Sequence, residues 1–467
     1  MFALSCRRLP LRVSAALLAA TLAGAAVAEP DDFEDTQVKF QTTYIVQWHP
    51  GFGERRPAGI DWTKYSGGES RPAYGLTNGK DKSYTATVTG YFGFRPWQGG
   101  ELYLNPEITQ GVPFTGGLVG MGGFYNGEIT RAAGTNPKLY RQRLFLRQTW
   151  GLGGGTEKVE SDLNQMAGTV DKNRFVLTVG NFSTLDVFDK NEYSNDPRRQ
   201  FMNWGNMCNV AFDYAADARG WSWGATGEWY QGDWAFRYGR MTGPKSPNGE
   251  WMDYRIFKHY GDQVEVERNH EIDGKAGSVR VIAWRNKAKL AAFRDAINYG
   301  NSVGWAPDPD NGMEYILKVR NGEKFKYGVG VNMDQALSDN LGVFFKAMWA
   351  DGRTETYAFG EVDRSIATGL SLKGGYWGRA QDTVGVAYLA HFLSRDRREY
   401  LEKGGISFFI GDGWLNYRPE QVLETYYSLN VVKGVWLTAD LQHVRNPAYN
   451  ADRGPVNIAG LRFHAEF

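Results

Sequence analysis

Apolar residues alternate one by one with polar or small residues in many segments of this chain. The runs FKYGVGVNM at 325–333 and VGVAYLAHF at 384–392 show the pattern clearly, because every second position is apolar. Successive side chains of a β-strand point to opposite faces, so each run predicts a strand with one apolar face. Their length, about ten residues, is that of a tilted strand that crosses a membrane.

The same alternation predicts sixteen strands along the chain. We place them at residues 38–48, 82–94, 98–108, 140–151, 174–182, 221–230, 233–241, 262–271, 277–286, 325–336, 341–350, 366–376, 383–392, 421–431, 434–446 and 456–467. An even number of antiparallel strands is typical of bacterial outer-membrane barrels. The predicted fold class is therefore all-β, a transmembrane antiparallel β-barrel of about 16 strands.

The connections between these strands alternate between short and long. Tight turns such as Gln231-Gly232, Asp273-Gly274 and Lys433-Gly434 alternate with long gaps at 49–81, 109–139, 183–220, 242–261, 287–324, 351–365 and 393–420. Short periplasmic turns and long extracellular loops are typical of outer-membrane barrels. The scheme requires a long periplasmic link at 152–173. It also requires that the short alternating run at 314–320 be part of a loop, because another strand would break the parity.

Both ends of the chain indicate export to the outer membrane. Residues 1–28 combine an arginine-rich start, an apolar run and a closing Ala-Val-Ala, which predicts a signal peptide cut after Ala28. Residues 29–467 then form a single barrel domain. The last seven residues, LRFHAEF, predict a final strand whose terminal aromatic, Phe467, is the signal for the barrel-assembly machinery. The alternative is that the chain merely ends on this residue.

The composition agrees with a β-structure and limits the kinds of partner that the protein can bind. The chain holds 58 Gly, 16 Trp, 25 Tyr and 26 Phe at a mean hydropathy of −0.47, which suits a large β-structure better than a helical bundle. The signal contains three of the 53 basic residues and none of the 52 acidic ones, so the mature chain carries 50 against 52. This balance argues against a nucleic-acid partner. Cys208 is the single cysteine after the signal, and we expect a buried thiol rather than a nucleophile or a ligand.

Sixteen strands enclose an aqueous channel, so the residues that face inward choose the solute. If the apolar faces contact lipid, two neighbouring strands send charged and aromatic side chains into the lumen, namely Glu101, Tyr103, Asn105 and Glu107 from the first and Arg143, Phe145 and Arg147 from the second. Sugars offer hydroxyl groups to charged donors and acceptors, and C–H faces to aromatic rings. Paired charges with aromatics therefore predict a pore for neutral sugars. The alternative is that these pairs only neutralise one another.

The long gap at 183–220 is the second candidate for the solute site. It contains the turn-forming Asn195-Asp196-Pro197, followed by Arg198 and Arg199 and, a few residues later, Trp204. A loop of this length could fold into a wide barrel and narrow it. We therefore predict an inward-folded constriction loop, with an outward solvent loop as the alternative.

Several blocks of sequence resemble the carbohydrate-selective outer-membrane porins of the OprB type. They are DVFDKNEYSNDPRRQFMNW at 186–204, FDYAADARGWSWGATGEW at 212–229, GTNPKLYRQRLFLRQTWGLGG at 134–154, HYGDQVEVERNHE at 259–271, FGEVDRSIATGLSLKG at 359–374 and NPAYNADRGPVNIAGLRFHAEF at 446–467. The resemblance covers nearly all of the mature chain, although residues 38–81 match less clearly. Arg147 stands in the LFLRQ block that resembles the family, Arg143 directly precedes this block, and Trp204 stands in the NW pair.

The resemblance implies a sixteen-stranded barrel in the outer membrane of a Gram-negative bacterium. It implies passage of monosaccharides such as glucose, through a constriction built by the second and third loops and neighbouring strands. No cofactor is implied. The outward face is expected to contact outer-membrane lipid and lipopolysaccharide, and a homotrimer is a further expectation because porin barrels commonly form trimers.

Three other classes of protein must be weighed. An enzyme would need a catalytic set, and pairs such as Glu265 and Glu267 are expected by chance among 52 acidic residues. The chain contains no Gly-x-Ser-x-Gly elbow, His-Glu-x-x-His helix or phosphate-binding glycine loop. A general or anion-selective porin would carry a one-sided arginine ladder at its narrowest ring instead of balanced charges with aromatics. A secreted sugar-binding sandwich would stay soluble without detergent.

Overall fold

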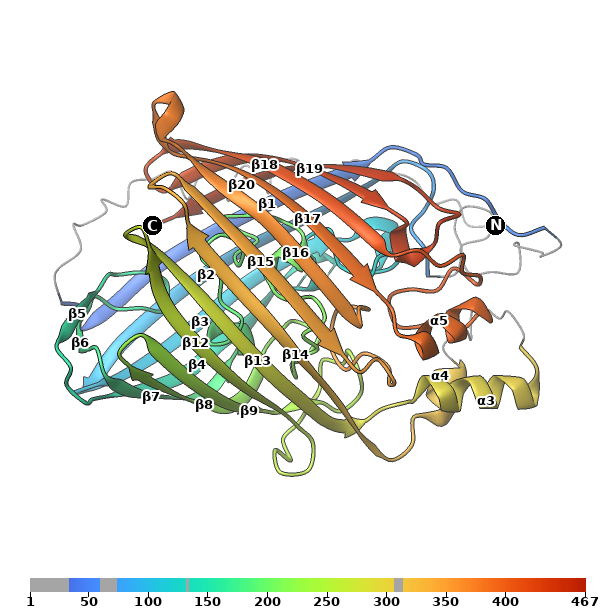
Figure 1. Cartoon of the computed structure of the whole chain (residues 1–467), viewed down its shortest axis with the longest axis horizontal. Coiled ribbons are helices and arrows are strands. Elements are labelled where there is room, and N and C mark those ends of the chain that lie inside the picture. The colour runs from blue at the N-terminus through green and yellow to red at the C-terminus, as the bar shows by residue number, and fades with distance from the viewer. Residues whose placement is uncertain (1–32, 59–73, 132–133, 306–313) are drawn as a thin grey trace.

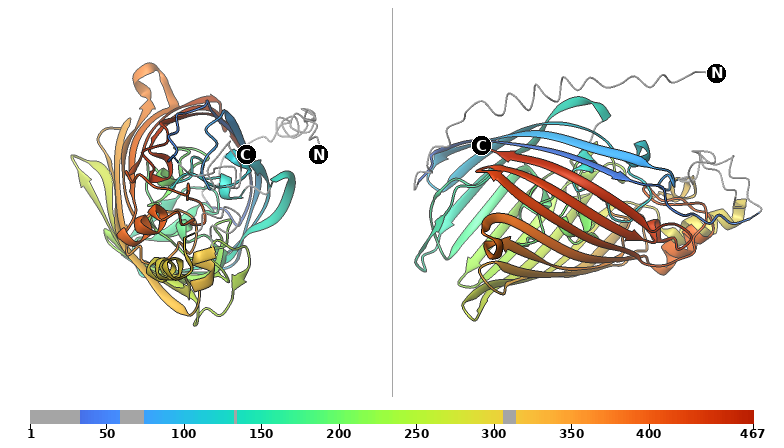
Figure 2. Two further views of the ribbon diagram at one scale, coloured as in Figure 1. Left: turned by 90° about the vertical axis from the view of Figure 1, so that its right-hand side faces the viewer. Right: turned by 90° about the horizontal axis from the view of Figure 1, so that it is seen from above.

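The computed structural model describes residues 33–58, 74–131, 134–305 and 314–467. Sixteen antiparallel strands close into a barrel (Figures 1 and 2). They are β1 (Thr36–His49), β2 (Asp81–Trp97), β3 (Gly100–Val112), β4 (Gly134–Gly151), β7 (Arg174–Phe182), β8 (Ser222–Gln231), β9 (Trp234–Met241), β12 (Tyr260–Ile272), β13 (Lys275–Lys289), β14 (Glu323–Ala336), β15 (Leu341–Ala350), β16 (Arg364–Gly374), β17 (Arg379–Phe392), β18 (Glu420–Val432), β19 (Val435–Arg445) and β20 (Val456–Glu466). The predicted fold class is confirmed, and each predicted strand overlaps one of these sixteen. The predicted signal peptide lies outside the described residues.

Two small hairpins and several short helices lie in the connections. The hairpins are β5 (Thr156–Val159) with β6 (Gly168–Asp171), and β10 (Gly243–Pro244) with β11 (Met252–Asp253). The α-helices are α2 (Trp204–Met207), α3 (Phe293–Val303), α4 (Glu314–Val319) and α5 (Arg395–Glu402). The run at 314–320 is thus mainly helical, as the parity of the barrel requires.

Among the described helices, none has the length and apolar character needed to cross a membrane.

The barrel closes between its first and last strands. β1 pairs antiparallel with β20 from Gln41 opposite Glu466 to Trp48 opposite Ala459. Phe467 extends this seam by one step, because its backbone N–H and C=O both bond to Phe40 at 3.0 Å. The start of β1 and the end of β20 lie at the end of the barrel that carries the tight turns (Figure 1). Helices α3, α4 and α5 lie at the opposite end, in the long loops.

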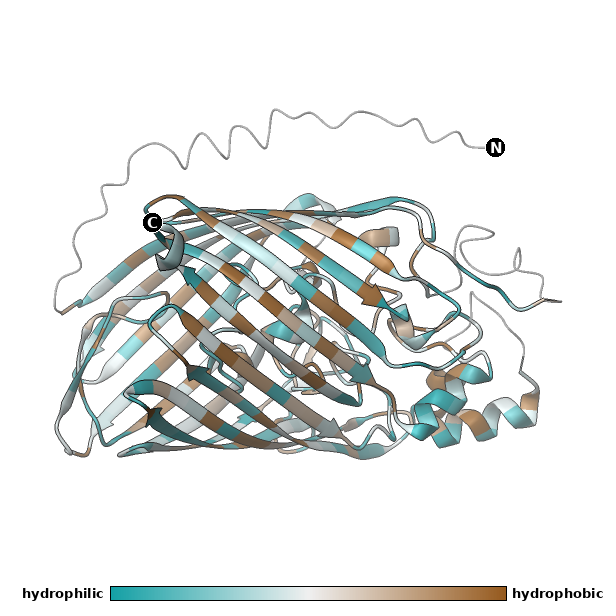
Figure 3. Ribbon diagram, turned by 45° about the horizontal axis from the view of Figure 1, so that its top comes forward, coloured by the Kyte–Doolittle hydropathy of each residue, from teal (hydrophilic) through white to brown (hydrophobic). Residues whose placement is uncertain are grey.

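The alternation of the sequence sets which side chains face outward. On β3, Leu102 and Leu104 are 41% and 42% exposed on the outer surface, whereas Tyr103 between them is fully buried. Hydrophobic and hydrophilic residues alternate along the strands in the same way (Figure 3). Aromatic rings gather near both ends, with Trp229 on Phe236 beside one tight turn and Tyr327 near Trp349 towards the loops. An apolar band with aromatic girdles is the lipid-facing surface of an outer-membrane barrel.

Candidate functional site

The third loop, residues 183–221 between β7 and β8, folds into the barrel and is bonded to opposite walls. Asp189 N–H donates to Glu265 on β12 at 2.8 Å. On the other side, the Arg462 side chain of β20 donates to the carbonyls of Pro197 and Gln200 at 2.8 and 2.7 Å. The prediction of an inward-folded constriction loop is confirmed, and the solvent-loop alternative is excluded.

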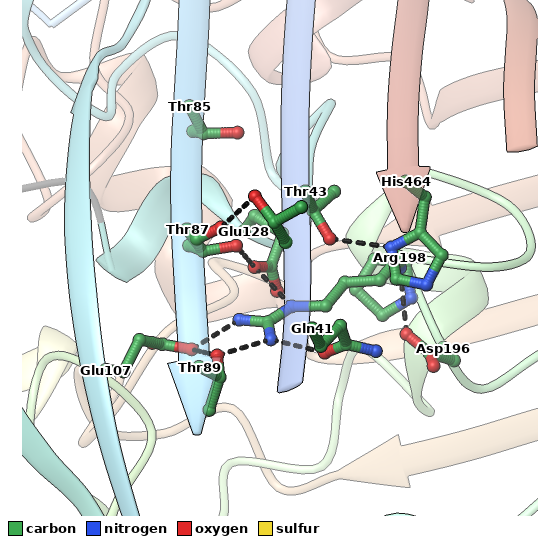
Figure 4. A network of polar contacts seen from close by, with 12 residues as sticks. Gln41, Thr43, Thr85, Thr87, Thr89, Glu107, Glu128, Asp196, Arg198 and His464 are labelled. Atoms are coloured by element: carbon green, nitrogen blue, oxygen red, sulfur yellow. Dashed lines mark hydrogen bonds and ion pairs between the residues drawn. The ribbon is translucent and has the colours of Figure 1, made fainter. Parts of the chain in front are cut away.

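Arg198 joins the loop to the first three strands (Figure 4). Its guanidinium donates to Glu107 on β3 at 2.6 Å and to Glu128 of the second loop at 2.7 Å. It also donates to Thr89 on β2 at 3.0 Å and to Gln41 on β1 at 2.7 Å. Because Arg198 is almost wholly buried and its donors are used by the wall, it anchors the loop instead of offering donors to a solute.

Aromatic packing fixes the next part of the loop. Phe201 lies edge-on against Tyr426 of β18, with ring centroids 4.8 Å apart. Trp204 begins α2 and packs against Phe124 of the second loop at 5.6 Å and Phe359 of another outer loop at 4.9 Å. Trp204 is only 3% exposed, so it shows little of its ring to the lumen.

A cavity of about 630 Å³ lies between the third loop, the inner faces of β1, β2 and β4, and the β4–β7 link. The charged and aromatic side chains around it are Arg143, Arg147, Lys190, Arg198, Arg199, Arg219, Glu128, Asp162, Asp186, Glu192, Asp196, Tyr91, Phe145, Trp204 and Tyr214. Six basic side chains thus meet five acidic ones. The volume falls in the range of small-molecule pockets, about 300–1,000 Å³.

Arg143 and Asp186 form a two-point ion pair at this cavity. Nε and one terminal nitrogen of Arg143 donate to the two carboxylate oxygens at 2.8 and 2.7 Å. The guanidinium also lies over the ring of Trp221, 4.5 Å from its centroid. Burial raises the pKa of Asp186, but the charge and hydrogen bonds of Arg143 outweigh this effect, and the pKa lies below its usual value. The carboxylate is therefore charged at neutral pH.

Arg147 forms the next charged contact along β4. It approaches Glu101 of β3 at 3.4 Å and donates to the carbonyl of Asn164 at 3.1 Å. Behind it, Tyr103 and Phe145 stack across the two strands with centroids 5.0 Å apart. The predicted facing of Glu101 with Arg147, and of the two rings between the charges, is confirmed by the strand register.

The register shifts farther along the β3–β4 hairpin. From there on, the predicted acidic row on β3 does not face the predicted basic row on β4. Asn105 faces Arg143, but the next residue, Pro106, faces Arg141, so Gln142 is an extra residue on β4. Proline has no N–H to give to the ladder, and such positions favour a bulge. Glu107 consequently faces Tyr140, and its ion-pair partner is Arg198 of the third loop instead of an arginine on β4.

The ten predicted site residues separate into two groups. Those that line the cavity are Arg143, Phe145, Arg147, Arg198, Arg199 and Trp204. Those that lie on the inner side of β3 behind the cavity are Glu101, Tyr103, Asn105 and Glu107. Asn105 is fully buried, and neither of its amide atoms has a hydrogen-bond partner among the described residues. Arg199 lies at the cavity, and its Nε and one terminal nitrogen donate to the two carboxylate oxygens of Glu466 of β20, both at 2.5 Å.

Two lumen charges on the third loop were not predicted. Lys190 and Glu192 both line the cavity. Within the part of the chain that the structure describes, neither side chain makes a hydrogen bond or an ion pair. Burial lowers the pKa of Lys190, and burial together with the nearby Asp334 raises the pKa of Glu192. The sequence shows that these two charges lie two residues apart in the third loop. This spacing does not tell whether either side chain points into the lumen.

Ion pairs also cover the opposite inner wall. Arg237 on β9 contacts Glu228, Glu265 and Glu267 at 3.0 to 3.1 Å. Arg280 on β13 continues the row to Glu267 at 2.7 Å. Arginines on this wall are therefore matched by acids and do not form a one-sided ladder. No group of three or more His, Cys, Asp or Glu side chains suited to a metal ion occurs among the residues described.

A closed barrel with a lipid-facing band, an inward loop and a polar internal cavity defines an outer-membrane porin. The sequence profile of the carbohydrate-selective porin, OprB family, matches residues 93–467. The chain belongs to this family and is a multi-pass β-barrel channel of the outer membrane of a Gram-negative bacterium, not an enzyme fold.

A solved structure shares this fold. The high-pH structure of Pseudomonas putida OprB is 14% identical, with 93% of this chain and 94% of that chain covered and a TM-score of 0.67. The outer membrane channel DcaP of Acinetobacter baumannii is 12% identical, with 93% and 97% covered and a TM-score of 0.49. No curated protein sequence matches the chain significantly.

Proposed function

We propose that this channel carries small neutral sugars, with monosaccharides such as glucose preferred, down their gradient into the periplasm. The observation that carries the proposal is the balance of charge around the internal cavity, where six basic side chains meet five acidic ones. An ion gains little from such a lining, because each attractive charge has a repulsive one beside it. A sugar gains from both, because each hydroxyl is a donor and an acceptor.

In this proposal Arg143, Arg147 and Arg199 give hydrogen bonds to sugar hydroxyls, and Asp186 accepts them. Each guanidinium is held by a carboxylate or a carbonyl, so it is oriented before the sugar arrives. Phe145 supplies a limited apolar contact, since it is almost wholly buried. A channel needs binding weak enough for release, and hydrogen bonds that replace water give such modest affinity.

The other predicted residues support this lining. Glu101 holds Arg147, and Tyr103 stacks behind Phe145. Glu107 and Arg198 lock the third loop to the wall, and Trp204 packs the loop from within. Asn105 keeps its predicted place on the inner face of β3 without reaching the cavity. Contacts with lipopolysaccharide and the barrel-assembly machinery, and a homotrimer, stay predictions.

The alternative is a general or anion-selective porin. Lys190 favours it, because this ammonium faces the cavity without a partner among the described residues. The two functions differ in how flux depends on concentration. In proteoliposomes, glucose flux through a sugar-selective channel should saturate and be inhibited by a second monosaccharide. Flux that rises linearly with glucose and ignores the competitor would show a general porin.

A further inference from the structure

The link between β4 and β7, residues 152–173, does more than connect two strands. It contains the β5–β6 hairpin, whose tip (residues 160–167) folds against the inner side of the barrel. Gln37 of β1 donates to the carbonyls of Asp162 and Gln165, both at 2.9 Å. Met166 is almost fully buried, and its N–H donates to the hydroxyl of Tyr103 at 3.3 Å. The tip is therefore fixed to the wall at several points.

The same tip borders the cavity proposed for sugars. Asp162, Leu163, Asn164 and Gln165 all line it, together with the arginines of β4 and the third loop. The Asn164 carbonyl accepts a hydrogen bond from Arg147 at 3.1 Å. The hairpin lies at the end of the barrel where the tight turns are found (Figure 1). The tip thus bounds the cavity between the third loop and that end.

Asn164 has two properties that a simple turn residue does not require together. Its φ of 57° is left-handed, a conformation that asparagine adopts more readily than most residues. Its side-chain oxygen is buried and has no hydrogen-bond partner among the described residues. A buried polar atom without a partner is costly, and a bound solute or water would relieve this cost.

We propose that residues 162–165 form the exit-side wall of the sugar cavity, and that the amide of Asn164 binds a sugar hydroxyl there. This inference rests on the proposed sugar function and adds a second selective element to the third loop. The wall restricts the length of the sugar that can pass, so that a monosaccharide fits and a longer sugar is retarded.

Two substitutions distinguish the role of the Asn164 side-chain amide from that of its backbone conformation. Asn164→Ala removes the amide at a left-handed position, whereas Asn164→Gly removes it and suits that position. We expect both to weaken glucose block of the ion current by about 2- to 10-fold, the loss of one hydrogen bond. If glucose blocks the current of the Asn164→Gly channel as strongly as that of the wild type, Asn164 only shapes the turn, and its proposed role as a sugar contact is wrong.

A third variant tests the wall itself. Leu163, Asn164 and Gln165 are changed together to glycine, and Thr169→Ala serves as the control, because Thr169 lies exposed on the same hairpin and away from the cavity. Heat-modifiable migration on gels verifies folding of each variant. We expect higher single-channel conductance, passage of larger neutral polymers and a higher disaccharide-to-glucose flux ratio in the triple variant, with no change in the control.

The outcomes distinguish the two proposals. If wild-type current is not blocked by glucose, the sugar function fails, but conductance and polymer size still report on the wall. If glucose blocks the wild type while the folded triple variant keeps the wild-type conductance, polymer limit and flux ratio, the inference about the link fails alone.

Discussion

Arg198 of the third loop and Glu107 of β3 lie 2.6 Å apart, and both are buried inside the barrel. The pair joins residues far apart in the chain and holds the constriction loop against the wall. Arg198 also forms an ion pair with Glu128 of the second loop at 2.7 Å, so that one guanidinium neutralises two buried carboxylates.

We predict that Arg198→Ala destabilises the folded channel by about 3–5 kcal/mol, because it leaves two buried carboxylates without their counter-charge. The denaturant midpoint and the noise of the open-channel current measure the effect. Lys275→Ala is the control, since Lys275 pairs with an exposed Asp339 and should change little. Equal midpoints for the two variants would show that Arg198 does not lock the loop.

Arg143→Ala should change sugar affinity and ion preference together. It removes a charged donor worth about 1.5–3 kcal/mol and frees Asp186, so glucose block weakens and the pore turns towards cations. Without Arg143, the pKa of Asp186 rises from its lowered value, because the effect of burial is then opposed mainly by Lys190 and the Ser183 N–H. As the pH falls, the cation preference of the variant should therefore decline at a higher pH than that at which the wild-type Asp186 takes up a proton.

Reversal potentials in a salt gradient, recorded over this pH range, measure the effect of Arg143→Ala. The wild type should show no such decline until a lower pH, because its Asp186 stays charged. A variant that keeps both the wild-type glucose block and the wild-type ion preference would remove Arg143 from the proposed site.

Lys190 should titrate at a lower pH than an ordinary lysine. Burial lowers its pKa, so the ammonium loses its proton earlier as the pH rises, and the anion preference of the pore declines with it. Lys190→Gln should be less anion-preferring at neutral pH and lack this decline. The measurement is the reversal potential between neutral and alkaline pH. Identical pH profiles for the wild type and Lys190→Gln would show that the lysine does not face the ions.

Cysteine labelling tests which side chains face the lumen. The native Cys208 is fully buried and burial raises its pKa, so its thiol should resist a water-soluble reagent until the protein is unfolded. In a Cys208→Ala background, Arg147→Cys should react and Leu146→Cys should not, since these neighbours point to opposite faces. Reaction at 146 with protection at 147 would mean that the register is shifted by one residue.

Much of the barrel could be predicted because each strand carries its own signal. Leu102, Tyr103 and Leu104 are all large and mainly apolar, yet the period of two along β3 was enough to assign inside and outside correctly. The parity of strands and loops likewise follows from local patterns. Even so, the bulge at Gln142 placed Tyr140 opposite Glu107, where an unbroken register would place Arg141, and the alternation alone does not reveal a single extra residue.

The site was harder to predict from the sequence, because its shape depends on contacts between residues that are far apart in the chain. Lys346 on β15 donates to the carbonyl of Asn206, and Glu424 on β18 accepts from the N–H of Met202, so strands from the second half of the barrel set the path of the third loop. No periodicity records such contacts. The arginines of the loop were therefore predicted as a pair, whereas at the cavity Arg198 is buried in ion pairs with the wall and Arg199 is more exposed.

The most direct test of the account is a glucose titration of the ion current through the purified channel in a planar bilayer, with the reversal potential recorded in the same membrane. We predict a saturable block by glucose, weaker block by a disaccharide and only weak ion preference, because balanced charges line the cavity. A current that glucose lowers no more than a non-sugar solute of equal viscosity does, together with strong anion selectivity, would contradict the account and identify an anion-selective porin.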